Sequence, residues 1–182
     1  MKTTYILMAG LPGTGKTTLA EALAAELDAA VLNKDVVRAA LFPGRFTDYT
    51  REQDDLCFDA LLEAANYLAR QGRTRFIFLD GRTFSRRFQI EQAVRAAEAA
   101  GCSWKILHTV CPVPIAEARL LKDRGSHVAL NRTVEMYREV KARFEPILYP
   151  HCEIDTSQPL ASSLRQATQY LAAATMEQPP MS

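Results

Sequence analysis

A glycine-rich segment near the amino terminus carries the residue types that proteins use to bind nucleotide phosphates. Residues 10–17 read GLPGTGKT and match the pattern G-x-x-x-x-G-K-[ST] at every specified place. In this pattern backbone N–H groups surround phosphate oxygens, the lysine contacts the β and γ phosphates, and the final hydroxyl ligates Mg²⁺. Lys16 is therefore a candidate catalytic residue and Thr17 a candidate metal ligand. We expect nucleotide contacts from Gly10, Gly13, Thr14, Gly15, Lys16, Thr17 and Thr18.

A carboxylate and a guanidinium follow the second apolar run of the chain. Asp35 and Arg38 are three residues apart, which places them on one face of a helix that begins there. Asp35 suits an amino-terminal helix position, so capping is an alternative role for it. Its place after a strand, opposite the phosphate loop, favours a general base that orients an acceptor hydroxyl. We expect Arg38 to bind an anionic group of the acceptor or to pair with Asp35.

A third group of charged residues predicts a lid. Arg119 and Arg124 lie on a helical segment that ends in a Gly-Ser break, and Arg132 follows as a weaker candidate. Arginines in a lid stabilise the charge on a phosphoryl group in transfer and exclude water. We therefore expect Arg119 and Arg124 to act in catalysis, with a lid over about residues 119–133. A solvated helix face is the simpler alternative.

These residues need a scaffold, and the hydrophobic pattern predicts an α/β fold. Short apolar runs at 5–9, 30–33, 76–80, 105–110 and 152–155 indicate strands, and the segments between them have helical period. Leu19, Leu23 and Leu27 share one helix face, and Leu56, Leu61, Leu62, Ala65 and Leu68 form a broader stripe. Strands that alternate with helices favour a parallel sheet covered on both faces, hence a three-layer fold. Ligands then bind beyond the carboxyl ends of the strands.

Composition limits the other classes of function. The 182 residues have a net charge of +1, which disfavours a general polyanion-binding surface. No apolar run is long enough to span a bilayer, and we predict a cytoplasmic protein with no membrane partner. The four cysteines are scattered, which indicates reduced thiols rather than disulfides or a zinc site. We expect one domain over residues 1–174 and a flexible tail over 175–182.

The phosphate loop also occurs in GTPases and ATPase motors, which this sequence does not match. A GTPase carries Asp-x-x-Gly after a strand and a late Asn-Lys-x-Asp, but 80–83 read DGRT and 33–36 read NKDV. A motor of the AAA type ends its second-motif strand in Asp-Glu, whereas the run FIFLD is followed by glycine. Acceptor residues and lid arginines together favour a kinase.

These motifs resemble those of the small P-loop kinases of the AAA-33 type over residues 3–160. That group includes polynucleotide 5′-hydroxyl kinases, zeta toxins and chloramphenicol phosphotransferase. The phage-type polynucleotide kinase domain has Arg-Asp-x-x-Arg after its second strand, and this chain has Lys34-Asp35-x-x-Arg38. The resemblance implies a five-stranded P-loop fold with an arginine-bearing lid, Asp35 as general base and Arg38 on an acceptor phosphate.

The resemblance also implies roles for two later segments. The third strand of the similar kinases ends in Asp, followed by a polar loop and an Arg-Arg pair, like residues 80–87 here. This implies acceptor contacts from Asp80, Arg82, Thr83 and Arg87, with Mg²⁺ as the alternative partner of Asp80. Thr156 follows the last strand, in the loop that borders adenine in related kinases. Phe46, Tyr49 and Phe84 are candidates for stacking on a base or sugar, or for packing.

The sequence thus predicts an ATP- and Mg²⁺-dependent kinase that acts on an acceptor hydroxyl. A small metabolite, nucleoside or antibiotic suits the neutral charge balance. A polynucleotide 5′ end suits the pair of Asp35 and Arg38 and the basic cluster Arg82, Arg86, Arg87 and Arg95. A nucleoside monophosphate kinase and a non-catalytic ATP-binding module are further alternatives. The sequence does not decide between ATP and GTP or define an oligomeric state.

Overall fold

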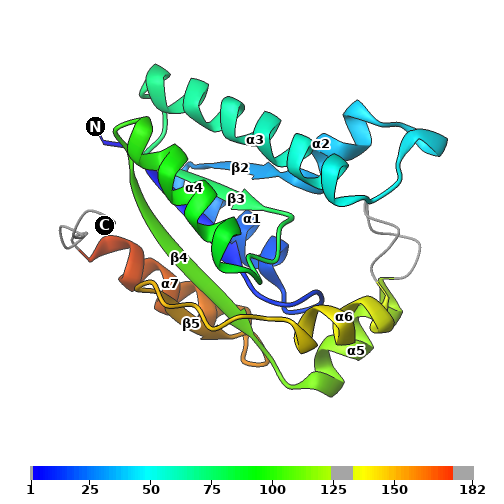
Figure 1. Cartoon of the computed structure of the whole chain (residues 1–182). Helices are drawn as coiled ribbons and strands as arrows, with labels where there is room; N and C mark the ends of the chain where they lie inside the picture. Colours follow the sequence, from blue (N-terminus) through cyan, green and yellow to red (C-terminus); the bar gives the residue numbers. More distant parts are fainter. Residues whose placement is uncertain (1, 124–132, 174–182) are drawn as a thin grey trace.

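The computed structural model describes residues 2–123 and 133–173. Its sheet has five parallel strands, as the sequence predicts, and their order is β2-β3-β1-β4-β5. Figure 1 shows this sheet with helices on both sides. The strands are β1 (Thr4–Ala9), β2 (Ala30–Asn33), β3 (Phe76–Asp80), β4 (Ser103–Val110) and β5 (Cys152–Asp155).

The helices begin and end where local chemistry favours it. The Asn33 side chain accepts hydrogen bonds from the N–H groups of Asp35 and Val36, which satisfies the start of α2. Gly72 ends α3 with φ 63°, a left-handed conformation that glycine adopts without strain. The helices are α1 (Lys16–Leu27), α2 (Lys34–Leu41), α3 (Arg51–Gln71), α4 (Arg87–Ala99), α5 (Val113–Lys122), α6 (Val134–Ala142) and α7 (Leu160–Ala172), with a 3₁₀ turn η1 (Gly44–Phe46).

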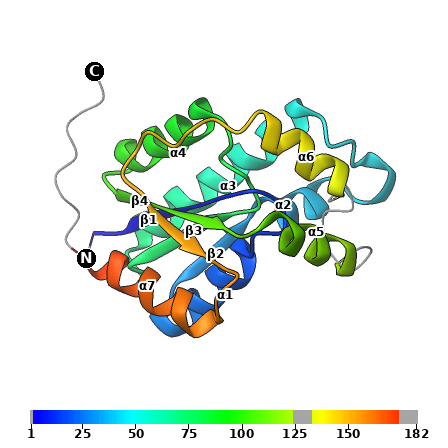
Figure 2. The ribbon, with the colours of Figure 1, turned by 90° about the horizontal axis from the view of Figure 1, so that it is seen from below.

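Two hydrophobic cores lie on opposite faces of the sheet. Successive strand side chains point to opposite faces, so Tyr5 and Leu7 of β1 pack with α3 and α4, whereas Ile6 and Met8 pack with α1 and α7. The view in Figure 2 shows α3 and α4 on one side of the strands and α1 and α7 on the other. This arrangement is the predicted three-layer fold. It leaves the carboxyl ends of the strands at one edge, where the phosphate loop lies.

The predicted apolar stripe of α3 is wrong at one residue. Leu56 of α3 is 51% exposed. The core face of α3 is instead formed by Phe58, Leu61 and Ala65, which follow one another at helical spacing. Leu56 is not on that face, because helical spacing turns it away from the sheet.

A smaller hydrophobic cluster supports the region beyond the sheet. Ala116 and Leu120 of α5 pack against Tyr137 of α6, and Leu11 of the phosphate loop contacts the same cluster. The pair α5–α6 is therefore attached to the loop through side-chain packing. Among the described helices none is long and apolar enough to cross a bilayer.

A buried lysine of the sheet forms hydrogen bonds with the end of the last helix. Lys105 of β4 is 6% exposed, and its Nζ donates to the carbonyl oxygens of Tyr170 (2.6 Å) and Ala173 (2.7 Å) at the end of α7. A cation at a helix carboxyl terminus satisfies carbonyls that have no partner within the helix. Burial lowers the pKa of Lys105, with a smaller contribution from Arg75.

We expect Lys105→Met to lower the free energy of unfolding by about 1–3 kcal/mol, because buried carbonyls lose their donor. Urea denaturation with α-helical circular dichroism measures the change. Lys2→Met, at an exposed position, is the matched control. Equal stability of the two variants would show that the α7 carbonyls find water instead.

Candidate active site

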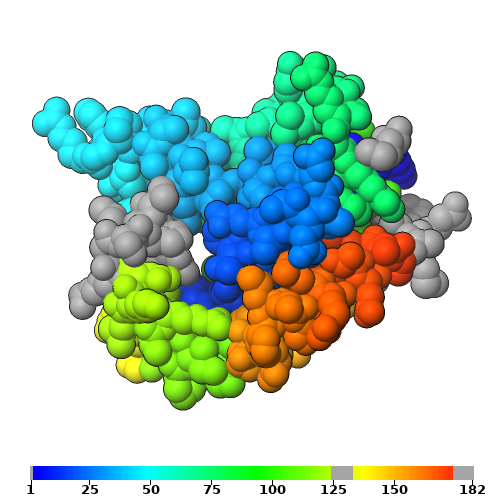
Figure 3. All heavy atoms as spheres, turned by 180° about the vertical axis from the view of Figure 1, so that it is seen from behind, coloured from blue at the N-terminus to red at the C-terminus, as the bar shows by residue number. Residues whose placement is uncertain are grey.

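A cavity of about 1100 Å³ opens at the carboxyl ends of the strands. Its walls come from the phosphate loop, the amino ends of α2 and α3, the loop after β3, and helices α5 and α6. Figure 3 shows the molecule hollowed between the blue segment that contains α1 and the yellow-green segment that contains α5. Among the described residues, nine cationic and six carboxylate side chains line the cavity, a surplus of three positive charges that suits a polyanionic ligand.

The phosphate loop is held in its wrapped form by close packing. Gly13 has φ 78°, and a Cβ there would lie 2.7 Å from the carbonyl oxygen of Ala116, so no larger residue fits. The Thr14 hydroxyl lies 2.8 Å from that of Thr109 on β4, and it donates to the Leu11 carbonyl at 2.7 Å. The loop is thus fixed on the side that faces the protein. The same loop contains Gly10, Thr14 and Gly15. Thr18, in the first turn of α1, lines the cavity.

Lys16 is the first residue of α1 and lines the cavity. Its Nζ donates to the carbonyl oxygens of Gly10 (2.9 Å) and Leu11 (2.8 Å), across the mouth of the loop. The ammonium group therefore lies against the backbone of the phosphate loop, at the edge of the cavity.

Asp80 and Thr17 form the candidate metal site. The Thr17 hydroxyl donates to Asp80 Oδ2 at 2.7 Å, and the Asn33 amide donates to the same oxygen at 2.8 Å. Asp80 is fully buried, and its Oδ1 has no hydrogen-bond partner among the described residues. A buried carboxylate oxygen without a donor suits a hydrated cation, and oxygen ligands suit Mg²⁺. The residues present therefore fit Mg²⁺ between the loop and β3.

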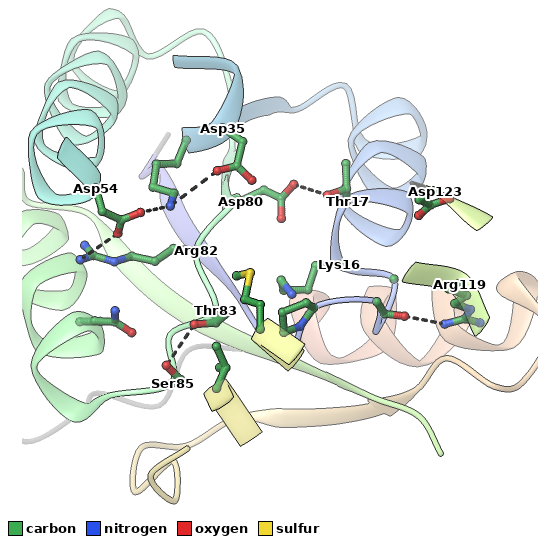
Figure 4. A pocket seen from close by; sticks show the side chains of 18 of the residues that line it. Lys16, Thr17, Asp35, Asp54, Asp80, Arg82, Thr83, Ser85, Arg119 and Asp123 are labelled. Atoms are coloured by element: carbon green, nitrogen blue, oxygen red, sulfur yellow. Dashed lines mark hydrogen bonds and ion pairs between the residues drawn. The ribbon is translucent and has the colours of Figure 1, made fainter. Parts of the chain in front are cut away.

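Asp35 lines the cavity on the side of α2 (Figure 4). Arg38 Nη1 donates to its Oδ1 at 3.1 Å, and Lys34 Nζ lies 3.6 Å from the same oxygen. Asp35 Oδ2 accepts no hydrogen bond from the residues that the structure describes. Asp35 does not cap α2, since Asn33 has that role. One oxygen of Asp35 is thus held by cations and the other is available to a ligand.

Two carboxylates that the sequence analysis did not single out complete this wall. Asp54 accepts from Lys34 and, at 2.6 Å, from Arg38 Nη2, and Asp55 Oδ1 lies 2.6 Å from Arg82 Nη2. Burial raises the pKa of Asp54, but the charges of Lys34 and Arg82 and the hydrogen bond from Arg38 hold it below the ordinary value. The wall is a buried network of alternating charge.

Arg38 and Arg82 are therefore committed to protein partners. Both are nearly fully buried, and Arg82 also donates to Gln92 at 3.0 Å and lies over the Phe58 ring at 4.4 Å. The two arginines line the cavity, but their charges are neutralised by the carboxylates of α2 and α3. The sequence offered the pair of Arg38 with Asp35 as one alternative, but it could not show the pairs with Asp54 and Asp55, because those carboxylates lie on another helix.

Arg119 lies beside the phosphate loop (Figure 4). It donates to the Thr156 carbonyl at 2.7 Å and to the Gly13 carbonyl at 3.4 Å, and the Thr156 hydroxyl donates to the Thr14 carbonyl at 2.9 Å. Arg119 and Thr156 thus lie together at the loop, and both line the cavity. The other predicted lid residues, Arg124 and Arg132, lie outside the described residues, as does most of the predicted lid and the tail.

The remaining predicted acceptor residues divide into two groups. Thr83 lines the cavity, donates to Ser85 at 3.0 Å, and accepts the Gly10 N–H at its carbonyl. Arg87 is not among the residues that line the cavity, and it pairs with Glu91 at 2.7 Å on the surface. Of the stacking candidates, Tyr49 lines the cavity, Phe84 is buried in the core, and Phe46 is exposed away from the lining.

The fold and this arrangement of loop, Asp80 and Thr17 define a P-loop nucleotide-binding protein. Solved structures of similar fold include a sugar kinase from Janibacter sp. (20% identity, 94% of this chain and 96% of that chain, TM-score 0.68). They also include an APS kinase from Mycobacterium tuberculosis in complex with AMPPNP and APS (15%, 94% and 99%, 0.72) and a gluconokinase from Sinorhizobium meliloti (14%, 95% and 98%, 0.63). A search of curated protein sequences returned no match.

The family follows from the sequence itself. The model of the AAA domain family AAA_33 matches residues 6–147, which is most of the chain. The chain belongs to the AAA_33 family.

Proposed function

We propose that the protein is a kinase that transfers the γ-phosphoryl group of ATP, with Mg²⁺, to a hydroxyl group of a small acceptor. The acceptor oxygen attacks the γ-phosphorus, the bond from that phosphorus to the β–γ bridging oxygen breaks, and ADP leaves with the bridging oxygen. The acceptor proton passes to Asp35 late in the step, because phosphoryl transfer is loose. Lys16 and Arg119 bind the nucleotide. Thr17 and Asp80 would hold Mg²⁺, which would offset phosphate charge when bound.

One observation carries this proposal. Asp35 lines the cavity that the phosphate loop also lines, and its Oδ2 accepts no hydrogen bond from the described residues. A cavity residue with an available acceptor oxygen opposite the γ-phosphate position suits a hydroxyl group, which donates a hydrogen bond to it. Two of the proteins with a similar fold are named as a sugar kinase and a gluconokinase, which agrees with a small-molecule acceptor.

The surface charges favour a small acceptor over a polynucleotide. The basic cluster of the sequence is largely compensated in the structure, because Arg82 pairs with Asp55, Arg86 with Glu145, and Arg87 and Arg95 both with Glu91. A nucleic-acid surface requires arginines and lysines whose charge is available to phosphates. Set against these three carboxylates, the four arginines of this cluster leave a surplus of one positive charge.

The test is transfer of labelled phosphate from γ-labelled ATP to a panel of sugars, sugar acids, nucleosides, hydroxylated antibiotics and 5′-hydroxyl oligonucleotides. We expect label on a small molecule and on no oligonucleotide. Label on an oligonucleotide end would replace the small acceptor with a polynucleotide. Absence of transfer to every compound, with tight ATP binding retained, would favour the ATP-binding module.

A further inference from the structure

Asp54 lies at the centre of the charged network that borders the proposed acceptor position. A single oxygen, Oδ1, accepts from Lys34 and from Arg38, and Oδ2 lies 3.5 Å from Arg82 Nη2. Asp54 is on α3, whereas its partners are on α2 and in the loop after β3. This one carboxylate therefore connects the segments that form the acceptor wall.

Asp54 and Asp35 compete for the same two cations. Lys34 and Arg38 each approach Oδ1 of Asp35, and both donate to Oδ1 of Asp54. The one ammonium charge and the one guanidinium charge are thus shared by two carboxylates. Lys34 Nζ donates its hydrogen bond to Asp54 and lies 3.6 Å from Asp35 Oδ1, so it does not form a hydrogen bond with Asp35 Oδ2.

We propose that Asp54 is a positioning residue for phosphoryl transfer. It holds Lys34 and Arg38 so that they orient Asp35 through one oxygen only and leave the other to the acceptor hydroxyl. The inference rests on the proposed function, because it gives Asp35 a role in transfer. Asp54 also lines the cavity, but in this proposal it acts through Lys34 and Arg38.

The charge balance explains why the position needs a carboxylate. Without Asp54, two buried cations would have Asp35 as their main counter-ion, since Asp55 pairs with Arg82. The Lys34 side chain would then turn to Asp35 and occupy the oxygen that the acceptor needs, because a buried charge without a partner is costly.

We expect Asp54→Asn to lower kcat roughly 10- to 100-fold, with the KM for ATP changed less than about 3-fold. Transfer is measured to the acceptor that labelling identifies, and to water as release of labelled phosphate, which needs no identified acceptor. The matched control is Asp55→Asn, on the same helix and in an ion pair with the buried Arg82, but without an ion pair to Lys34 or Arg38. We expect it to lose several-fold less activity than Asp54→Asn.

A second variant separates positioning from loss of stability. The double variant Asp54→Asn/Lys34→Met lacks the ammonium group that would turn to Asp35. Its kcat should therefore be higher than that of Asp54→Asn. Both are measured in buffer without urea, where all variants are folded. If kcat instead falls equally in Asp54→Asn and Asp55→Asn, or follows the unfolding midpoint, Asp54 has only a structural role. If Asp35→Asn leaves transfer and phosphate release unchanged, the proposed function fails, and this inference fails with it.

Discussion

Lys16→Met should lower phosphoryl transfer roughly 1,000-fold, whatever hydroxyl compound accepts the phosphate. The ammonium group is the only part of the side chain that methionine lacks, and it lies across the mouth of the phosphate loop on two carbonyl oxygens. When nucleotide binds, the same group would neutralise charge on the β and γ phosphates, which grows during transfer. Steady-state kinetics with labelled ATP measures the effect.

The matched control for this change is Lys141→Met, an exposed position of α6 that does not line the cavity. It should retain wild-type kcat. Loss of less than about 10-fold in Lys16→Met would contradict the assignment of the loop lysine to the transferring phosphate. ATP binding, followed by calorimetry, should weaken in Lys16→Met, since the cation contacts the nucleotide in the ground state as well.

The strands β1 and β3 were predictable because burial on both faces leaves a clear pattern in the sequence. All five apolar runs are strands, and the first and fourth begin only one and two residues earlier than the sequence suggests. Parallel strands covered on both sides consist of continuous apolar residues, so their limits are marked by the polar residues that follow. The phosphate loop was predictable because its wrapped backbone requires glycines, which stand at fixed places in the sequence.

The ion pairs that Asp54 and Asp55 form in the acceptor wall were not predictable, because they depend on how α3 packs against its neighbours. Asp54 nevertheless left a signal. It precedes Phe58, Leu61 and Ala65 at helical spacing and therefore lies on the core face of α3. A carboxylate on an apolar helix face needs a buried cation as its partner. Acidic residues in the first turn of a helix are common, and this obscures the signal.

Arg38 illustrates how such pairing changes a functional interpretation. From its spacing, this arginine could bind an anionic acceptor group or pair with Asp35. The structure has it donating to Asp35 and Asp54, with its guanidinium 5.2 Å from the Tyr49 ring centroid. Nη1 and Nη2 are thus engaged with carboxylates, whereas Nε has no hydrogen-bond partner among the described residues. The charge of Arg38 is therefore shared with two carboxylates before any acceptor binds.

Asp35→Asn should keep ATP binding within about 3-fold of wild type and lower kcat roughly 10²- to 10⁴-fold. The amide preserves the shape and the contact with Arg38, but it cannot take the acceptor proton, and its NH₂ group cannot accept the hydroxyl hydrogen bond. Since Asp35 lies on α2 and not on the phosphate loop, the nucleotide contacts are unaffected. Calorimetry with ATP and steady-state transfer assays measure the two quantities on one preparation.

The control for Asp35→Asn is Asp28→Asn, at a left-handed position (φ 48°) beyond α1 that asparagine also tolerates. It should leave both quantities unchanged. A drop in kcat of less than about 10-fold in Asp35→Asn would indicate an acceptor that needs no base, such as a phosphate group, which attacks in its ionised form. The size of this one effect therefore separates a hydroxyl acceptor from a nucleoside monophosphate, because only the hydroxyl has a proton to lose as the new bond forms.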